Sequence, residues 1–252
     1  MSTPTISLIT VTRNDARGLS ATLDTIRDQT YPDIEYIVVD GGDDEETPAL
    51  ISTNRALVSH YIREPDNGIY DAMNKGLDLT TGEFVCFMNA GDGLYSQETL
   101  QQVADAINHK VDVVFGEAML VDKNYRDLGL RSQATTQRLP HELTWRSMEY
   151  GMVVSHQAFY ARTSITPHYV LGNLCADIDW VIRILKASRK NTFVEKPLTK
   201  FVLGGISQQR FWSSMWGRYL VLSHHFGRIR TTLNHLPIVA RSLFFRIKLL
   251  FF

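Results

Sequence analysis

Three apolar runs of strand length constrain the fold most strongly: Ile6–Val11, Ile34–Val39 and Phe84–Met88. Phe84–Met88 is unbroken, and a continuous run rather than an alternating one is typical of a strand buried on both faces of a sheet. The other two runs are mostly apolar, and Ile6–Val11 is expected to be a buried strand as well. The first two runs and the apolar residues at helical spacing between them fit within about 35 residues, the size of a βαβ unit. The sequence therefore predicts an α/β fold in which a mostly parallel central sheet is flanked by helices.

Polar residues follow each of these runs. The runs end at Thr12-Arg13, at Asp40 and at the turn Asn89–Asp92, which carries one carboxylate. Because ligands of open α/β sheets bind beyond the carboxyl ends of the strands, we expect these residues to share one edge and face a ligand. The alternative is a turn in which Asn89 and Asp92 only satisfy backbone groups, and this stretch alone leaves both interpretations open.

The remaining elements are predicted from periodicity and turn residues. Helices are expected around Leu19–Ile26 and at Ile69–Leu79, Leu100–Ile107 and Ile178–Leu185, and short strands at Val58–Ile62, Val111–Phe115, Ala118–Val121, Ser132–Thr135 and Ser155–Tyr160. The second half of the chain is thus expected to be more mixed than the first.

Charge is distributed unevenly along the chain. Residues 1–195 contain 17 Lys/Arg and 27 Asp/Glu, whereas residues 196–252 contain nine Lys/Arg and no acid. A basic segment attached to an acidic globular part is expected to meet an anionic partner. No nucleic-acid readout motif accompanies the charge, so nucleic acid is not the expected partner.

Seven short motifs occur in order along residues 5–207. They are Ile6–Asn14, Gln29–Gly42, Glu64–Gly76, Gly82–Asp92, Ser155–Gln157, Ala176–Asp179 with Arg183, and Gly204–Ser207. Together they resemble the inverting glycosyltransferases of family 2, which have the nucleotide-sugar-binding GT-A fold. The similarity is greatest to bacterial enzymes of exopolysaccharide, capsule or O-antigen assembly. The resemblance implies a catalytic domain at residues 1–207 and a separate tail at residues 208–252.

The resemblance also implies a nucleotide-sugar site at the sheet edge, with a UDP-sugar as the favoured donor. Donor contacts are assigned to Val11, Thr12, Arg13, Asp40, Asp66, Asp71, Asn74, Asn89, Ala90 and Gly91. Asp40 is expected to accept hydrogen bonds from the base, and its alternative role is to cap the Gly41-Gly42 turn. Asp66, Asp71 and Asn74 begin a helix and are structural in the alternative interpretation.

Asp92 is the implied metal-binding carboxylate, for Mn²⁺ or Mg²⁺. Such hard ions take oxygen ligands and neutralise the charge that develops on a diphosphate leaving group. Many relatives have a pair of acids here, whereas this chain has Asn89-Ala90-Gly91-Asp92 and a single acid. The donor phosphates are therefore expected to complete the coordination of the ion.

Glycosyl transfer with inversion needs a general base that takes a proton from the acceptor hydroxyl. The resemblance assigns this role to Asp177, six residues before Arg183, and a plain helix N-cap is the alternative. Asp179 cannot face the same site, because residues two apart on a helix point about 200° apart. His156 and Gln157 are expected to face the donor sugar or the acceptor, with a satisfied structural role as the alternative.

The tail is expected to end in an interfacial helix. The fifteen residues after Pro237 would span about 22 Å as a helix, which is short of a roughly 30 Å hydrocarbon core. A helix with Arg241 and Lys248 on one face would instead lie on the anionic inner leaflet, or else pack on the catalytic domain or dimerise. This favours a saccharide acceptor carried on a polyprenyl diphosphate. No signal peptide is expected, so the protein is expected to be cytoplasmic and peripheral on the inner face of the membrane.

Two other functions compete with this interpretation. A sugar nucleotidyltransferase on a related sheet would need a Gly-rich basic loop after the first strand, and Thr12-Arg13-Asn14-Asp15 is not such a loop. A non-catalytic nucleotide-sugar-binding or membrane scaffold protein is compatible with the single carboxylate of the expected metal site.

Overall fold

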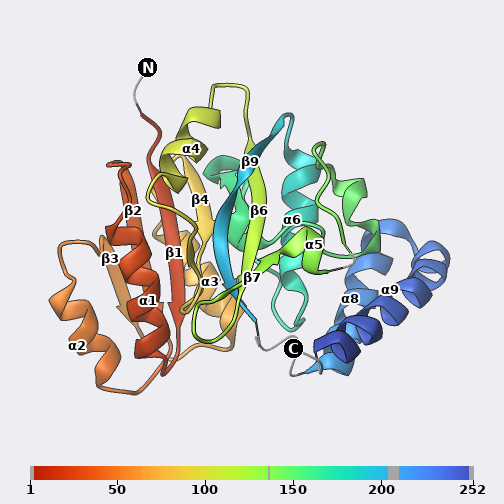
Figure 1. Ribbon diagram of the computed structural model, residues 1–252, viewed down its shortest axis with the longest axis horizontal. Helices are drawn as coiled ribbons and strands as arrows, with labels where there is room; N and C mark the ends of the chain where they lie inside the picture. The colour runs from red at the N-terminus through yellow and green to blue at the C-terminus, as the bar shows by residue number, and fades with distance from the viewer. Residues whose placement is uncertain (1–2, 136, 204–209, 250–252) are drawn as a thin grey trace.

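One mixed sheet runs through the molecule, with helices on both of its faces (Figure 1). The computed structural model describes residues 3–135, 137–203 and 210–249, with side chains described as far as Ser242. The strands are β1 Ile6–Thr12, β2 Ile34–Asp40, β3 His60–Arg63, β4 Phe84–Phe87, β5 Gly93–Leu94, β6 Val113–Val121, β7 Asp127–Leu130, β8 Phe159–Arg162 and β9 Asn191–Val202. The α-helices are α1 Ala16–Arg27, α2 Glu46–Thr53, α3 Ile69–Asp78, α4 Thr99–Ala106, α5 Arg131–Ala134, α6 Ala176–Ala187, α8 Phe211–Phe226 and α9 Arg228–Leu249. Within the described residues, short 3₁₀ helices are η1 Trp145–Tyr150, η2 His156–Ala158 and η3 Thr163–Ile165.

The first half of the chain forms the parallel half of the sheet. The strand order is β3-β2-β1-β4-β8-β6-β9-β5, with β7 paired to β6. β3, β2, β1 and β4 are all parallel neighbours, and β8 lies antiparallel between β4 and β6. The predicted α/β fold with a mostly parallel central sheet is therefore confirmed.

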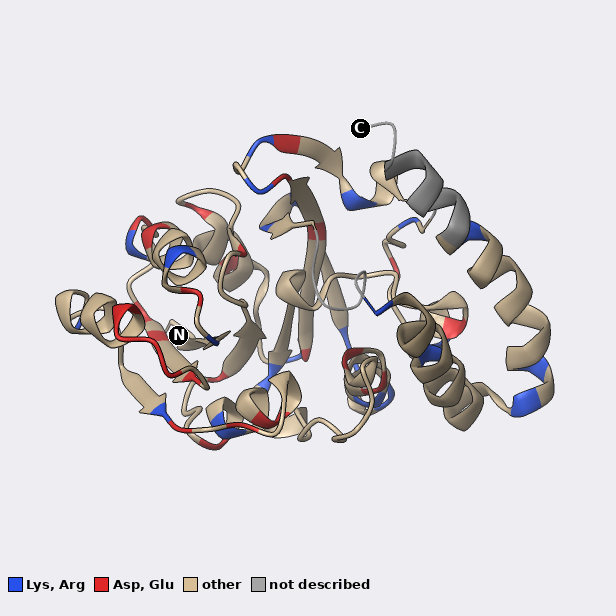
Figure 2. Cartoon of the chain, turned by 90° about the horizontal axis from the view of Figure 1, so that it is seen from below, with Lys and Arg blue, Asp and Glu red and all other residues tan. Residues whose placement is uncertain are grey.

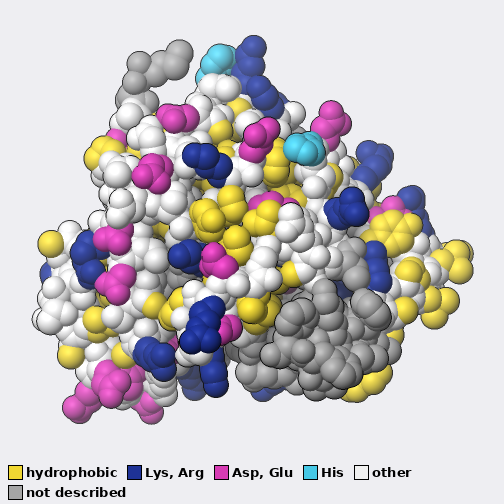
Figure 3. Space-filling view, in the orientation of Figure 1, with side chains coloured by type: hydrophobic (Ala, Val, Ile, Leu, Met, Phe, Trp, Pro, Cys, Tyr) yellow, Lys and Arg dark blue, Asp and Glu magenta, His cyan; other side chains and the backbone are white. Residues whose placement is uncertain are grey.

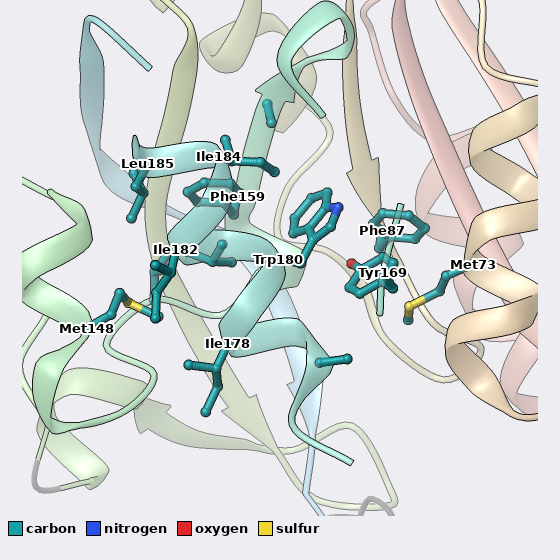
Figure 4. Close-up of a cluster of buried hydrophobic side chains, with 14 of the residues drawn as sticks. Met73, Phe87, Met148, Phe159, Tyr169, Ile178, Trp180, Ile182, Ile184 and Leu185 are labelled. Carbon is teal, nitrogen blue, oxygen red and sulfur yellow. The ribbon is translucent and has the colours of Figure 1, made fainter. Parts of the chain in front are cut away.

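The central strands divide their apolar side chains between two cores. On one face, Ile9 and Val11 of β1 join a cluster with residues of α3 and α6. On the other face, Ile6 and Leu8 join a cluster with residues of α1, α2 and α4. Figure 4 shows the first cluster, in which Trp180 of α6 stacks on Tyr169 with ring centroids 5.0 Å apart. Because both faces are covered, the polar side chains of these strands are buried too, including Ser7 and Thr10 of β1 and Glu35 of β2.

Several predicted elements differ from the structure. The two strands expected at Val111–Phe115 and Ala118–Val121 are one strand, β6, whose pairing with β9 shifts register at Gly116 and Ala118. The strand expected at Ser132–Thr135 is wrong, because this segment winds into the short helix α5 and its bend. There the Thr135 backbone N–H and hydroxyl both donate to Arg131 O, at 2.9 and 2.8 Å.

The strand expected at Ser155–Tyr160 is also displaced: it starts only at Phe159, after the 3₁₀ helix η2. Strands β5, β7 and β9 have no counterpart in the prediction. The motif Gly204–Ser207 and the boundary expected between residues 207 and 208 lie outside the described residues.

The C-terminal helices α8 and α9 form a hairpin that packs on α6 and η1 (Figure 1). Val221, Leu222 and Ile238 from these helices are buried in the first core cluster. Phe226 of α8 stacks on Trp145 of η1 with ring centroids 5.3 Å apart. No helix in the described part of the chain is long and apolar enough to cross a membrane.

Candidate active site

The carboxyl ends of β1, β2 and β4 meet at one edge of the sheet, as predicted. Thr12 pairs with Asp40 in the β1–β2 register, and the Gly41 N–H donates to Thr12 O at 3.0 Å. After β4, the Ala90 N–H donates to Val11 O at 3.2 Å. Arg13 follows on the surface and is exposed. These backbone bonds bring the three expected ligand-binding segments together.

Asp40 is fully buried and both of its carboxylate oxygens have partners. Oδ1 accepts from the Gly42 N–H at 2.8 Å, and Oδ2 accepts from the Tyr61 hydroxyl at 2.9 Å. The Arg63 Nε lies 3.6 Å from Oδ2. Burial, with Asp40 next to it, raises the pKa of Tyr61 to about 12, so its hydroxyl stays a donor. In this conformation Asp40 caps the Gly41-Gly42 turn, and its contact with a base stays a prediction.

Asp66 lies beside the same turn. Its Oδ1 accepts from the Gly68 N–H at 2.9 Å. Its Oδ2 is so close to Gly41 that a Cβ at that glycine would lie only 1.7 Å away. Gly41 is therefore needed for the close approach of these two loops, and Asp66 joins Asp40 at one end of the candidate site.

Asp71 and Asn74 have structural partners. Asp71 Oδ2 accepts from the Asn67 N–H at 2.9 Å, which caps the loop before α3. The Asn74 amide pairs reciprocally with the Tyr169 backbone: Nδ2 donates to O at 3.0 Å, and Oδ1 accepts from N–H at 2.7 Å. Both side chains hold α3 to its surroundings, and their assignment to the donor stays a prediction.

Asp92 is a buried carboxylate held by two donors. Gln157 Nε2 donates to its Oδ2 at 2.7 Å, and the Val202 N–H donates to its Oδ1 at 3.0 Å. Ser155 fixes the orientation of the Gln157 amide, because its hydroxyl donates to Oε1 at 2.6 Å. Burial raises the pKa of Asp92 to about 7, although both hydrogen bonds act to lower it. Gln157, expected to face the donor sugar or the acceptor, contacts the expected metal ligand in this structure, and its contact with a substrate stays a prediction.

The Asn89–Asp92 turn presents oxygen atoms that fit a hard divalent cation. Asn89 Oδ1 is buried and has no hydrogen-bond partner among the residues that the structure describes. Each carboxylate oxygen of Asp92 has a second lone-pair direction beyond the bonds described. Among the described residues, no three His, Cys, Asp or Glu side chains are grouped to hold a metal ion. An ion bound here would therefore need additional oxygen ligands from a substrate.

Helix α1 fixes the shape of this turn. The Thr22 hydroxyl donates to Asp92 O at 2.6 Å and accepts from the Gly91 N–H at 3.1 Å. Gly91 has a φ of +95°, a conformation that a side chain would strain. The sequence of the turn and its anchor on α1 thus present the Asn89 and Asp92 oxygens on the same short loop.

Asp177 lies in the first turn of α6, one residue inside the helix rather than just before it. Its Oδ1 accepts from the Ile178 N–H at 2.9 Å, and the Tyr70 hydroxyl, which also donates to Leu174 O at 2.9 Å, lies 3.3 Å from the same oxygen. Its Oδ2 lies 3.9 Å from His156 Nδ1, and a quarter of its side-chain surface (25%) is exposed. The carboxylate is thus held at one oxygen and accessible to a second reactant.

His156 connects Asp177 to the Asn89 turn. Its Nε2 lies 3.5 Å from Asn89 Nδ2, on the side of the ring away from Asp177. Burial lowers the pKa of His156, although the Asp177 charge raises it, so the imidazole is neutral at pH 7. One residue of η2 therefore faces the expected base while the next, Gln157, holds the expected metal ligand.

Asp179 points away from this site, in agreement with the helical geometry. Its carboxylate contacts Arg183 Nε and His225 Nε2, each at 2.7 Å. Asp179 therefore links α6 to α8, whereas Asp177 faces the sheet edge.

Thr22, Tyr70 and the Val202 backbone contribute to the site but were not predicted from the sequence. Tyr70 lies inside a quoted motif, but no sequence pattern pairs it with Asp177 across 107 positions. The Val202 backbone N–H belongs to β9, a strand that the sequence did not indicate. The Val202 contact could have been predicted only if β9 had been placed correctly in the sheet.

Comparison with known proteins identifies the family. The model of glycosyl transferase family 2 matches residues 7–166. A PGL/p-HBAD biosynthesis glycosyltransferase of Mycobacterium bovis is 39% identical over 194 residues, which cover 73% of this chain and 70% of that protein.

Solved structures show the same fold. S. aureus TarS in complex with UDP-GlcNAc has a TM-score of 0.69 at 17% identity, covering 94% of this chain and 72% of that one. The Pyrobaculum calidifontis mannosyltransferase PcManGT, in complex with GDP-Man and Mn²⁺, has a TM-score of 0.63 at 15% identity, covering 96% and 76%. The chain is a glycosyl-transferring enzyme with the GT-A fold, and it belongs to glycosyl transferase family 2.

Proposed function

We propose that this glycosyltransferase moves the sugar of a UDP-sugar to a saccharide acceptor, with inversion at the anomeric carbon and with Mn²⁺ or Mg²⁺ bound. The observation that carries the proposal is the chain of contacts from Asn89 through His156 to Asp177. The Asn89–Asp92 turn, whose oxygen atoms suit a metal ion bound to a diphosphate, is thus linked through His156 alone to the partly exposed carboxylate of Asp177. An inverting transfer needs these two groups on either side of one reacting carbon.

In the proposed reaction Asp177 is the general base. It takes the proton of an acceptor hydroxyl as that oxygen bonds to the anomeric carbon, and the bond from this carbon to the nucleoside diphosphate breaks. The Ile178 N–H holds one carboxylate oxygen, with the Tyr70 hydroxyl beside it, which leaves Oδ2 for the proton. Attack from the face opposite the leaving group inverts the configuration.

Asn89 Oδ1 and the Asp92 carboxylate would hold the divalent ion. A bound Mn²⁺ or Mg²⁺ supplies neutralisation of the charge that develops on the departing diphosphate. The Gln157 and Val202 donors keep the Asp92 carboxylate in one orientation. Support for a metal also comes from PcManGT, whose structure contains Mn²⁺.

The donor is proposed to be a UDP-sugar that lies along the carboxyl edge of β1, β2 and β4. TarS, which shares the fold, was solved with UDP-GlcNAc. The nucleoside would lie against Val11, Thr12 and Arg13 at the end of β1. Asp40 and Asp66 flank the Gly41 turn at the same end.

The acceptor is proposed to be a saccharide carried on a polyprenyl diphosphate, in the assembly of a bacterial surface polysaccharide. The enzyme would then act in the cytoplasm, peripheral on the inner face of the membrane. The support is electrostatic: residues 196–252 contain nine Lys/Arg and no acid, which favours an anionic bilayer surface.

Donor binding and transfer are tested separately. Thermal shift with a panel of nucleotide sugars and Mn²⁺ should show stabilisation by UDP-sugars that is lost in Asp92→Ala. Transfer to lipid-linked saccharide acceptors should be lost in Asp92→Ala and Asp177→Ala, and the anomeric configuration of the product should be inverted by NMR. Full transfer by Asp177→Ala, or a retained configuration, would refute the mechanism, and donor binding without turnover on any acceptor would favour a non-catalytic role.

A further inference from the structure

Helix α8 exposes a row of large apolar side chains at helical spacing. Trp212, Trp216 and Leu220 are 72%, 62% and 45% exposed. They follow one another at intervals of four residues and so lie along one side of the helix. The opposite side of α8 packs on the catalytic domain through Val221 and Leu222, which belong to the first core cluster. The row therefore faces solvent, while the other side of α8 is packed against the catalytic domain.

Helix α9 exposes a second apolar row. Ile229, Leu233 and Leu236 are 84%, 67% and 73% exposed, at spacings of four and three residues. Figure 3 shows hydrophobic side chains gathered over the end of the molecule that carries α8 and α9. Isolated exposed leucines are ordinary, but six large apolar residues on two adjacent helices are not.

The two rows belong to one surface. Trp216 stacks on Tyr219 with ring centroids 5.5 Å apart, and the Tyr219 hydroxyl lies 3.1 Å from Thr232 Oγ1 of α9. Tyr219 and Leu236 line a groove of about 450 Å³ between the helices. We name this surface, formed by Trp212, Trp216, Tyr219, Leu220, Ile229, Leu233 and Leu236, the hairpin face.

The hairpin is positively charged, although one of its arginines is paired, because Arg230 contacts Glu149 of η1. Residues 208–252 contain seven Lys/Arg and no Asp or Glu. Arg210 and Arg228 directly precede α8 and begin α9, and both are exposed. Figure 2 shows Lys and Arg positions along the two C-terminal helices. Apolar and aromatic side chains bordered by arginines are the composition of a surface that lies in the headgroup region of an anionic bilayer.

We infer that the hairpin face is the membrane-docking surface of this enzyme and that its occupant is an anionic phospholipid bilayer. The inference deepens the proposed function and rests on it for the choice of a bilayer over a protein partner. The docking surface differs from the helix expected after Pro237. In that segment Ile238 is buried, and the Arg241 guanidinium lies over the Tyr150 ring at 5.8 Å, so both contact the protein.

The inference is tested by vesicle binding of the full chain. Wild-type protein should co-sediment with vesicles of phosphatidylcholine and phosphatidylglycerol, and poorly with phosphatidylcholine alone or at high salt. The double variants Trp212→Ser/Trp216→Ser and Leu233→Ser/Leu236→Ser should each bind at least about tenfold more weakly, the effect of roughly 1.4 kcal/mol. Val170→Ser/Leu171→Ser is the matched control, because these residues are 57% and 49% exposed outside the hairpin and should not matter.

Tryptophan fluorescence gives a second measurement. Vesicles with brominated acyl chains should quench the wild-type emission, because Trp212 and Trp216 would enter the acyl boundary while Trp180 stays buried. Absence of quenching, or equal binding of the wild type and both hairpin variants, would overturn the inference. So would a dimer that the tryptophan variants dissociate in the absence of vesicle binding.

A separate measurement distinguishes this inference from the proposed function. All variants should keep the thermal shift produced by a UDP-sugar with Mn²⁺, because none of them lies in the donor site. Loss of vesicle binding with donor binding intact is the expected result. Vesicle binding without any donor binding would leave the docking surface standing and refute the proposed donor.

Discussion

Asp92 is held where ionisation is unfavourable, and this should make protein stability depend on pH. Its pKa rises from 3.8 to about 7 on folding, so the folded state binds the proton more tightly. The resulting stabilisation is complete below pH 3.8 and disappears as the pH rises through 7. We therefore expect Asp92→Asn to raise the melting temperature at pH 8 and to change it little at pH 4, in thermal melts without metal.

The hydrogen bonds of Gln157 and Ser155 can rearrange to accommodate the amide introduced by Asp92→Asn. Gln157 can turn its own amide and Ser155 its hydroxyl, so each hydrogen bond keeps a donor and an acceptor. The same variant should lose Mn²⁺-dependent donor binding, measured by titration calorimetry. A variant that is destabilised at pH 8 would contradict the burial argument.

Asp177 has a different environment, because part of its surface is open. Asp177→Asn keeps the size of the side chain and removes its ability to accept the acceptor proton. We expect kcat to fall about 10²–10⁴-fold, the usual contribution of a general base. Donor affinity should stay unchanged because no donor contact is assigned to Asp177. Asp179→Asn is unsuitable as a silent control, since Asp179 binds Arg183 and His225.

The site residues differ in how well the sequence predicts them. Asp92 and Asp177 stand in recognisable motifs, and their chemistry follows from residue type. The partner of Gln157 does not follow, because Asp92 is 65 positions away and reaches it only through the 3₁₀ turn η2. Hydrogen-bond partners of this kind depend on the relative placement of elements, which local patterns do not contain.

At the level of elements, Glu35 joins the amino-terminal ends of β1, β2 and β4, which lie at the end of the sheet away from the candidate site. Its carboxylate accepts from Ser7 Oγ at 2.5 Å, from the Thr81 N–H at 2.8 Å and from Thr81 Oγ1 at 2.6 Å, which joins β1, β2 and the loop before β4. Desolvation opposes ionisation, but these hydrogen bonds outweigh it and lower the pKa of Glu35. Its stabilising effect is therefore present above pH 4.5 and is lost as the pH falls.

Removal of this carboxylate should destabilise the fold. We expect Glu35→Ala to lower the free energy of unfolding by about 2–3 kcal/mol at pH 7, because buried donors lose their acceptor. The loss should be smaller at pH 3. Urea denaturation measures both, with Glu98→Ala as the control, since Glu98 is exposed and makes no capping bond. Equal losses at the two pH values would contradict the role of the charge.

Sequence periodicity predicts the elements best where burial alone determines which residues are apolar. The apolar-rich strands β1, β2 and β4 are buried on both faces, and their ends agree with the prediction to within one residue. The long β9 was missed because most of its side chains are only partly buried and Pro197 interrupts the pattern. Ser132–Thr135 was mistaken for a strand because threonine favours strands, while local hydrogen bonds to Arg131 wind it into a helix.

At the level of the whole molecule, the C-terminal hairpin is part of the folded body. The sequence indicated a basic, apolar tail and left open whether it packs or docks elsewhere. In the structure each helix does both: one side enters the core beside α6, and the other side exposes the hairpin face. A composition average over the tail cannot separate these sides, because apolar residues serve both.

A substitution of His225 tests whether the C-terminal hairpin and the catalytic domain unfold together. Its Nε2 donates to Asp179 Oδ1 at 2.7 Å, and its Nδ1 accepts from Lys186 Nζ at 3.0 Å, so one ring joins α8 to α6 at two points. His225→Ala leaves the buried Asp179 with Arg183 alone and should cost about 2 kcal/mol, or roughly 4–8 °C in melting temperature for a domain of this size. The adjacent, exposed His224 provides the matched control, and His224→Ala should shift the melting temperature by no more than about 1 °C. If the hairpin and the catalytic domain unfold together, both variants should melt in a single calorimetric transition. A separate, low-temperature transition that alone moves with His225→Ala would mean that the hairpin is an independent unit.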